Sequence, residues 1–166
     1  MKLYNYIICI FLICFSANAQ VENEGVFSGQ DFSNNLFLFD MESFLSNEEE
    51  IELIKTIDDF EKRTSNRLII VTTSSLGPIE SIRDYSDFVR IRFEEITNNN
   101  GQIAVFVISC ELRKTAISTN EKARMFLTDN ECKEIIEDFI IPEMKEGNYF
   151  EGVEEGVNKI IHYWDY

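Results

Sequence analysis

Few side chains of this 166-residue chain are suited to catalysis by their type and spacing. The only histidine, His162, lies next to Tyr163 on an expected helix, which favours a core or groove-facing role over general-base catalysis. No phosphate loop Gly-x-x-x-x-Gly-Lys, zinc helix His-Glu-x-x-His or calcium loop Asp-x-Asp-x-Asp-Gly occurs. Neither Cys110 nor Cys132 is followed six positions later by arginine, which excludes a cysteine-nucleophile phosphatase.

Acidic residues dominate the charge of the chain. It has 30 Asp and Glu against 15 Lys and Arg, a formal net charge of −15. Nucleic-acid binding is excluded as a function, because neutralising phosphates requires clusters of Lys and Arg that the sequence lacks. The length predicts one domain whose core needs neither a disulfide nor a metal.

Residues 1–19 have the composition of a cleaved export signal. Lys2 precedes an apolar run over 7–15, and Ala17-Asn18-Ala19 matches a signal-peptidase site. The run is too short for a membrane span, which needs about 20 apolar residues. We therefore expect a secreted or periplasmic protein without a membrane span after cleavage. An extended polar leader over residues 20–35 and one domain over residues 36–166 would follow the signal.

Two cysteines, Cys110 and Cys132, follow the expected cleavage site. An exported protein can oxidise such a pair to a disulfide. However, Cys110 ends an expected buried strand, and Cys132 lies on the apolar stripe of an expected helix. Because both positions suit cysteine as a small apolar side chain, the sequence favours two free thiols over a disulfide.

Helix signals are clearest at two capping boxes. Ser46 with Glu49, and Thr128 with Glu131, show the pattern of an N-cap hydroxyl followed three residues later by a glutamate. Apolar residues follow each box at helical spacing, which predicts a helix at both places. Pro142 is expected to end or bend the second of these helices.

The remaining elements predict the fold class. Leu68–Val71 and Ile103–Ile108 are continuous apolar runs, typical of strands covered on both faces. Helical spacing over 82–96 places a helix between them and favours a right-handed parallel crossover. Arg113–Thr119 is expected to be a hairpin partner of the second run, and a last helix covers 150–164. The predicted fold is α/β: a three-layer α/β/α sandwich around a small mixed β-sheet.

Short segments along most of the domain match the pattern of a known family. They are Asp40 with Phe44-Leu45-Ser46, Leu68–Thr72, Asn99-Asn100-Gly101 before Ile103–Ile108, Leu127-Thr128-Asp129, and Ile141-Pro142-Glu143-Met144-Lys145-Glu146-Gly147-Asn148-Tyr149-Phe150-Glu151-Gly152-Val153. On these segments the chain resembles the TPM domain family from Phe39 to Trp164. That family includes thylakoid-lumen proteins of photosystem II repair, a membrane accessory of acetylcholine receptors and exported bacterial proteins.

The resemblance implies an α/β/α sandwich and, for some members, acid-phosphatase activity or calcium binding at acidic loops near the strand ends. It makes Asp40, Asn99 and Asp129 the candidate metal ligands. It also makes Asn100 and Arg124 candidates for facing a bound ligand. Calcium is the candidate cofactor on this basis.

The chain departs from the family pattern at two of these loops. Members commonly have Asp where Asn99 stands, and Gly-x-Gly-x-Glu where this chain has Asn-x-Lys-x-Arg over 120–124. Two carboxylates are thus replaced by an amide and by the cation of Arg124. Because calcium prefers several anionic oxygens at once, these changes predict weaker binding. Asp40 and Asp129 keep the acidic side chain.

Each candidate also has a structural interpretation. Asp129 follows the expected N-cap and would stabilise the helix N-terminus by about 0.3–1 kcal/mol. Asp40 ends an expected strand, where an aspartate commonly forms a turn, and Asn98–Asn100 suits a turn because Asn tolerates positive φ. Both interpretations stay open at this point.

Two functions are consistent with these observations. The favoured one is a non-enzymatic accessory module that binds another protein, with membrane proteins among the candidate partners, and that has a weak calcium site as an option. The alternative is a metal-assisted acid phosphatase acting on phosphomonoesters. In that case Asp40 and Asp129 would hold the ion, and Arg124 would engage the phosphate.

Overall fold

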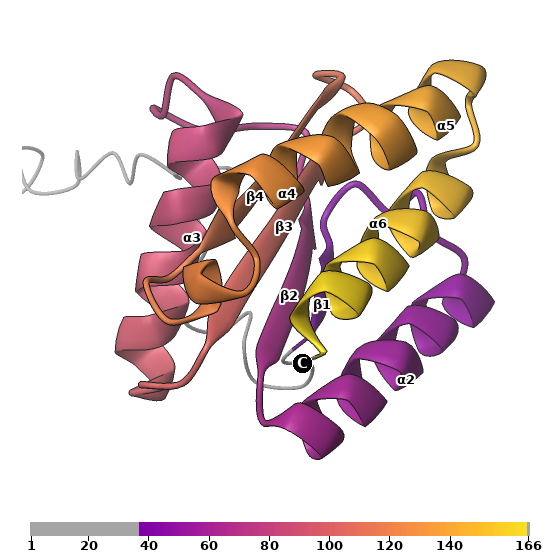
Figure 1. Cartoon of the computed structure of the whole chain (residues 1–166). Coiled ribbons are helices and arrows are strands. Elements are labelled where there is room, and N and C mark those ends of the chain that lie inside the picture. Colours follow the sequence, from indigo (N-terminus) through magenta and orange to yellow (C-terminus); the bar gives the residue numbers. More distant parts are fainter. Residues whose placement is uncertain (1–36, 166) are drawn as a thin grey trace, which may run out of the picture.

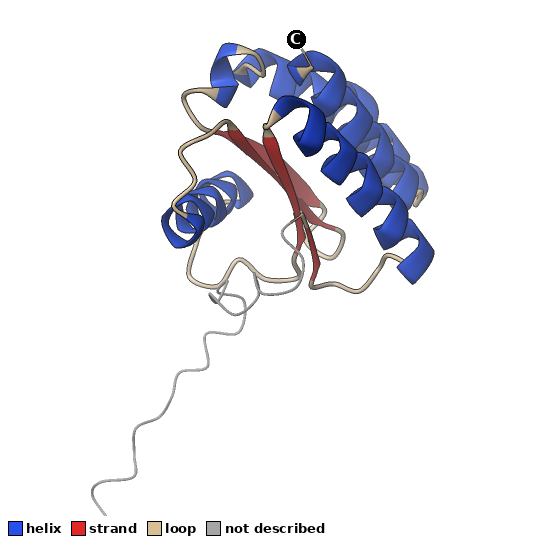
Figure 2. Ribbon diagram, turned by 90° about the horizontal axis from the view of Figure 1, so that it is seen from below, coloured by secondary structure: helices blue, strands red, loops and turns tan. Residues whose placement is uncertain are grey.

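The computed structural model describes residues 37–165, so the expected export signal and polar leader lie outside the described residues. A four-stranded sheet lies between α3 on one face and, on the other, a layer formed by α2, α6 and the helical run α4–η2–α5 (Figures 1 and 2). This is the predicted α/β/α sandwich. The elements are β1 (Leu38–Asp40), α2 (Asn47–Thr64), β2 (Arg67–Thr72), α3 (Ile82–Thr97), β3 (Ile103–Ser109), β4 (Lys114–Thr119), η1 (Ala123–Met125), α4 (Asp129–Glu134), η2 (Ile135–Ile140), α5 (Ile141–Glu146) and α6 (Tyr149–Trp164).

The sheet has the strand order β1-β2-β3-β4 and is mixed, as predicted. β1 and β3 both pair with β2 in parallel, with Ile70 opposite Phe106. β4 pairs with β3 in antiparallel orientation, with Val107 opposite Ala116, which confirms the expected hairpin. The short β1 and the hairpin strand β4 therefore form the two edges of the sheet.

Side chains alternate between two separate apolar cores on the two faces of the sheet. Ile69 and Val71 pack against α3, whose Val89 and Phe93 are fully buried. Leu68 and Ile70 of the same strand point to the other face and pack with α2, α6 and the helical run between α4 and α5. Continuous apolar strands result because both faces are covered, as the sequence predicted.

The two parallel crossovers differ in hand. From β1 to β2 to β3 the chain moves in one direction across the sheet, first through α2 and then through α3. These helices lie on opposite faces (Figure 2). Two successive crossovers in one direction through opposite faces have opposite hands, so one of them departs from the right-handed rule.

Both predicted capping boxes are present. Ser46 Oγ accepts a hydrogen bond from the N–H of Glu49 at 3.3 Å, and Glu49 Oε2 accepts one from the N–H of Ser46 at 2.6 Å. Thr128 and Glu131 repeat the pattern at the start of α4. These local bonds explain why both helices begin where the sequence predicts.

The helix after Thr128 does not end at Pro142. It widens into the π-helical turn η2, in which the N–H of Ile141 donates to Ile136 O, and then continues as α5. Proline lacks an N–H and its ring clashes with the carbonyl four residues earlier, so a wider turn before Pro142 lets the helix continue. The chain leaves the helix at Gly147, whose φ of 87° suits glycine.

η2 packs closely against α6 at a glycine. A Cβ added to Gly156 would lie 2.9 Å from two side-chain carbons of Ile140 and 3.1 Å from Phe106 Cε1. A Cβ added to Gly152, one turn earlier, would meet its nearest atoms at 3.3 Å. The close contact at Gly156 therefore sets how near η2 and β3 lie to α6.

Candidate functional site

The candidate residues lie at two opposite ends of the sheet. Asp40 is the last residue of β1 and pairs with Thr72 at the end of β2. Asn99 and Asn100 precede β3, whose first residue, Ile103, pairs with Arg67 at the start of β2. Because these strands are parallel, Asp40 and Asn99 are separated by the length of the sheet and do not form one metal site.

Asp40 connects its strand to the neighbouring strand and to the following loop. Its Oδ1 accepts from Thr72 Oγ1 at 2.5 Å, and its Oδ2 accepts the N–H of Leu45 at 2.9 Å. Both carboxylate oxygens therefore have protein donors. This geometry is that of a structural aspartate at a strand end.

Glu42 joins the same end of the sheet and was not predicted from the sequence. Its N–H donates to Thr72 Oγ1 at 3.0 Å. Its carboxylate accepts the N–H groups of Cys110 and Glu111 at 2.9 and 3.3 Å, and the hydroxyl of Ser109 at 3.2 Å. A glutamate alone in a loop, far along the chain from these donors, carries no pattern that would identify this role.

At the other end of the sheet, a cavity of about 610 Å³ brings three of the predicted residues together. Its lining consists of Asn99, Asn100 and Arg124 from the prediction, with Arg90, Glu94, Glu95, Thr119, Asn120, Glu121 and Lys122. We call this the loop-edge cavity. It is formed by the C-terminal part of α3, the turn before β3 and the segment after β4.

The turn before β3 uses its polar atoms internally. Asn98 has a φ of 48° and caps α3, and Asn99 Oδ1 accepts the N–H of Gly101 at 2.7 Å. The backbone carbonyl of Asn100 accepts from Lys122 Nζ. The turn interpretation of Asn98–Asn100 therefore describes their contacts.

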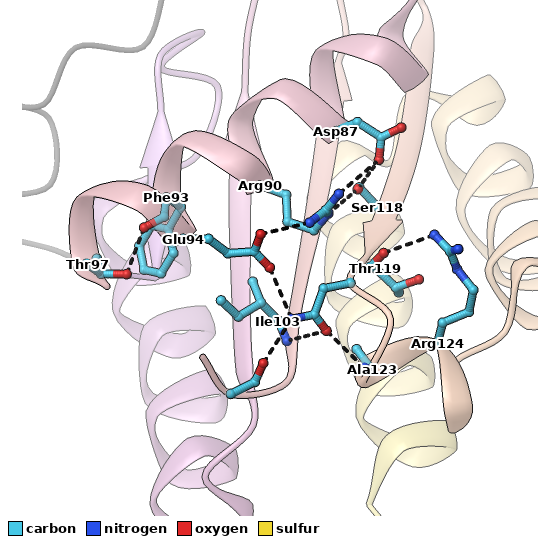
Figure 3. Close-up of polar contacts among 12 residues, drawn as sticks. Asp87, Arg90, Phe93, Glu94, Thr97, Ile103, Ser118, Thr119, Ala123 and Arg124 are labelled. Carbon is cyan, nitrogen blue, oxygen red and sulfur yellow. Dashed lines mark hydrogen bonds and ion pairs between the residues drawn. The ribbon is translucent and has the colours of Figure 1, made fainter. Parts of the chain in front are cut away.

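Arg90, one of the residues that line this cavity, is at the centre of a polar network (Figure 3). Its Nε donates to Ser118 Oγ at 2.9 Å, and its Nη1 donates to Glu94 Oε2 at 3.0 Å. Ser118 Oγ donates in turn to Asp87. The side chain of Arg90 is only 14% exposed, so these bonds hold a charge that is largely removed from water.

Asn120 stands where the resemblance implies a glycine, and its side chain binds four groups. Its Nδ2 donates to Glu94 Oε1 at 3.0 Å and to Gly101 O at 2.9 Å. Its Oδ1 accepts the N–H groups of Ala123 and Ile103 at 2.9 and 3.3 Å. A glycine could make none of these side-chain bonds. Asn120 thus connects α3, the turn before β3 and η1.

Asp129 forms ion pairs at the start of α4. Its Oδ1 lies 3.5 Å from Arg124 Nε, and its Oδ2 lies 3.9 Å from Arg83 Nη2. Arg124 also donates from Nη2 to Thr119 O at 3.2 Å (Figure 3). Arg124, at the position where the resemblance implies a glutamate, therefore places a cation beside the carboxylate that the resemblance makes a ligand.

These donors do not fit a calcium ion. Calcium takes six to eight oxygen ligands and favours carboxylates. Asp129 has a guanidinium nitrogen at 3.5 Å, the Asn99 oxygen accepts a backbone N–H, and Asp40 lies at the other end of the sheet. Within residues 37–165 no three His, Cys, Asp or Glu side chains are grouped to hold a metal ion.

The remaining chemically reactive side chains lie elsewhere. Cys110 and Cys132 are free thiols, and burial raises the pKa of each to about 12. His162 is exposed on α6, so the expectation of a core or groove-facing position was wrong. The reason is helical geometry: Ile160 and Trp164 face the core, and position 162 lies on the opposite side of the helix.

Across the described part of the chain, no helix is both long and apolar enough to cross a membrane.

Comparisons with known proteins agree with this architecture. The family description that matches is the TPM domain, over residues 38–163. The N-terminal domain of a protein from P. gingivalis superposes with a TM-score of 0.71 at 25% identity, covering 86% of this chain and 90% of that one.

Two further solved structures share the fold. The BA42 protein from the psychrophilic bacterium Bizionia argentinensis gives a TM-score of 0.60 at 21% identity, covering 75% of this chain and 83% of that one. The N-terminal domain of the cg2496 protein from Corynebacterium glutamicum gives 0.59 at 11% identity, with 81% and 82% covered. No curated protein matches the sequence. With the family pattern matched over most of its length and this fold, the chain belongs to the TPM domain family.

Proposed function

We propose that the protein is a non-enzymatic accessory module that binds another protein outside the cytoplasm. The observation that carries this proposal is the pairing of Asp129 with Arg124 at 3.5 Å, at the edge where family members carry acidic loops. A hydrolytic site at this edge would need a base or a metal-bound water that is free to act on substrate.

The acids that line the loop-edge cavity support the same proposal. Glu94 uses both oxygens, one for Arg90 and one for Asn120. The lining holds three acids, Glu94, Glu95 and Glu121, against the cations Arg90, Lys122 and Arg124. Phosphoryl transfer needs a concentrated positive charge or a metal to stabilise the transition state. A lining with balanced and internally bonded charges is better suited to keeping the loops in place.

We propose at most a weak calcium site at Asp129. Any calcium ion at Asp129 would compete with two guanidinium groups, so we expect binding to be weak. We expect export from the sequence of residues 1–19. Export would place the protein where calcium concentrations are high enough to fill weak sites.

The exposed acids of α4 and η2 indicate the charge of the partner surface. Glu134, Glu137 and Asp138 are exposed on one helical run. A chain with a net charge of −15 attracts cationic surfaces over a distance set by ionic strength. We propose a partner with a basic surface, and a membrane protein with basic loops is one such candidate.

A hydrolysis assay separates the accessory module from the alternative phosphatase. The purified protein is incubated with p-nitrophenyl phosphate and calcium, magnesium or manganese, beside the variants Asp40→Asn and Asp129→Asn. The proposal expects no turnover above the buffer control with any metal. Metal-dependent turnover that both variants lose would overturn it.

Restoring the family's acids tests why the cation site is weak. The double variant Asn99→Asp with Arg124→Glu adds two carboxylates and removes one guanidinium beside Asp129. We expect calcium to raise its melting temperature, while the unchanged protein shows little shift. Equal calcium responses in the two proteins would contradict the proposed cause, and Lys55→Glu on α2 is a control for added negative charge elsewhere.

The partner is tested by its charge dependence. A triple variant, Glu134→Gln, Glu137→Gln and Asp138→Asn, keeps the size of these exposed side chains and removes their charge. Capture of a membrane-fraction partner by this variant should fall about tenfold or more at low salt. Capture that is unchanged by the triple variant and by salt would contradict the proposed basic partner.

A further inference from the structure

A second cavity, of about 760 Å³, lies at the opposite end of the sheet from the loop-edge cavity. Its walls come from the turn between β3 and β4, the start of α3, and the helical run η2–α5 with the start of α6. We call it the hairpin cavity. It does not include any of the residues that the family resemblance makes metal ligands.

Unpaired cations are concentrated at the hairpin cavity. Most Lys and Arg side chains in the described part of the chain form ion pairs with acids. Arg113, Lys114 and Lys145 line this cavity, are exposed, and within residues 37–165 form no ion pair. In a protein with twice as many acids as bases, three such cations around one cavity form a positively charged rim.

Apolar side chains form the inner wall of the cavity. Ile82 comes from the start of α3, Ile136 from η2, and Ile141 and Met144 from α5. All four are only partly buried, so part of their apolar surface faces the cavity. A cationic rim over an apolar wall suits a ligand that has an anionic group at one end and a hydrocarbon body.

We propose that the hairpin cavity binds a small anionic amphiphile, a carboxylate with an aliphatic chain of medium length. The volume lies within the roughly 300–1,000 Å³ typical of small-molecule sites, and apolar walls with a few polar groups are the usual lining. The proposal is independent of the protein-binding function, because it rests on different residues at the other end of the sheet.

One acid shares the lining of the cavity with the three cations. Glu146 is the one acid in the lining and is exposed at the end of α5. Glu42 lies behind the wall, where its carboxylate is bonded to Ser109 and to the N–H groups of Cys110 and Glu111. The three cations of the rim therefore outnumber the single acid that shares the lining with them.

Binding of decanoate, below the concentration at which it forms micelles, tests the proposal directly. Calorimetry gives the dissociation constant, and amide chemical shifts locate the site. We expect shifts at Ile141, Gly147 and Thr115, weaker binding of the uncharged decanol, and weaker decanoate binding at high salt. The combined substitution Arg113→Gln and Lys145→Gln should raise the dissociation constant of decanoate by roughly tenfold and leave that of decanol nearly unchanged.

Control variants separate charge from fold and from apolar contact. Lys55→Gln on α2 removes another exposed cation that forms no ion pair with the described residues, and it should leave decanoate binding unchanged. Met144→Gln should weaken decanoate and decanol alike, because it makes the wall polar. Melting temperatures of all variants show that the fold is kept.

Several results would overturn the proposal. One is equal binding of decanoate and decanol, which would make the site purely apolar. Another is decanoate shifts that map away from the hairpin cavity. A third is the absence of decanoate binding; if an acidic peptide that contains phenylalanine binds instead, the cavity is a peptide site.

Discussion

Replacing Gly156 by alanine tests the close packing of α6 against η2 and β3. The new Cβ would lie 2.9 Å from Ile140 Cγ1 and Cδ1 and 3.1 Å from Phe106 Cε1. Favourable carbon–carbon contacts lie at about 3.5–4.0 Å, so these groups must move apart by about half an ångström. Ile140 and Phe106 are buried in the core between the sheet and helices α2 and α6, where little space is available for movement.

Two opposing free energies determine the size of the effect. Overpacking a core destabilises by about 1–3 kcal/mol. Alanine stabilises a helix relative to glycine by about 0.8–1.0 kcal/mol. We therefore expect Gly156→Ala to lower the free energy of unfolding by about 1 kcal/mol, which for a domain of this size lowers the melting temperature by roughly 3 °C.

Gly152→Ala is the matched control on the same helix. It gains the same helix propensity, but its Cβ meets Glu143 Cβ, Met144 Cγ and Ile140 O at 3.3 Å, so smaller shifts suffice. We expect its stability to be close to that of the unchanged protein. Urea unfolding followed by circular dichroism measures both. A Gly156→Ala variant as stable as Gly152→Ala would refute the packing argument.

Three further predictions concern the two ends of the sheet and the thiols. Asp40→Ala removes the acceptor for Thr72 and the loop, and should lower the free energy of unfolding by about 1.5–3 kcal/mol in urea titrations. Thr128→Ala removes the N-cap of α4 and should lower it by about 1 kcal/mol, with Thr128→Ser as the conservative control. Thiols of the unfolded chain have a pKa of about 8.5, whereas burial raises the pKa of Cys110 and Cys132 to about 12 in the folded protein. Their contribution to stability is therefore complete below about pH 8.5 and is lost as the pH rises toward 12. Stability curves of the unchanged protein and of a Cys110→Ser, Cys132→Ala variant should therefore converge or cross as the pH rises from 8 to 10, and parallel curves would contradict this expectation.

Much of the fold could be predicted because its signals are local. Ser46 with Glu49 and Thr128 with Glu131 determine helix starts through bonds within four residues. Apolar runs such as Leu68–Val71 identify strands whose two faces are covered, whatever the exact packing partners are. The π turn η2 was missed, because it depends on how the helix fits around Pro142 and against Gly156.

The candidate site was predicted less well, and part of the reason is geometric. Asp40 ends a strand and Asn99 precedes one, so in a parallel arrangement they lie at opposite ends of the sheet. This separation could have been predicted from chain order alone. The bonds of Glu42 and Asn120 could not, because they join segments far apart in sequence. Predicting the ion pair between Asp129 and Arg124 would have required knowing the path of the chain from η1 to α4.

Glu42 makes two non-adjacent parts of the sheet depend on each other. β1 has only three residues and pairs only with β2, yet the loop that follows it carries the acceptor for the turn after β3. A displacement of this edge strand would therefore withdraw the acceptor from Ser109, Cys110 and Glu111 at once. Since Ser109 and Cys110 also line the hairpin cavity, the shape of that cavity is coupled to the point where the chain enters the domain.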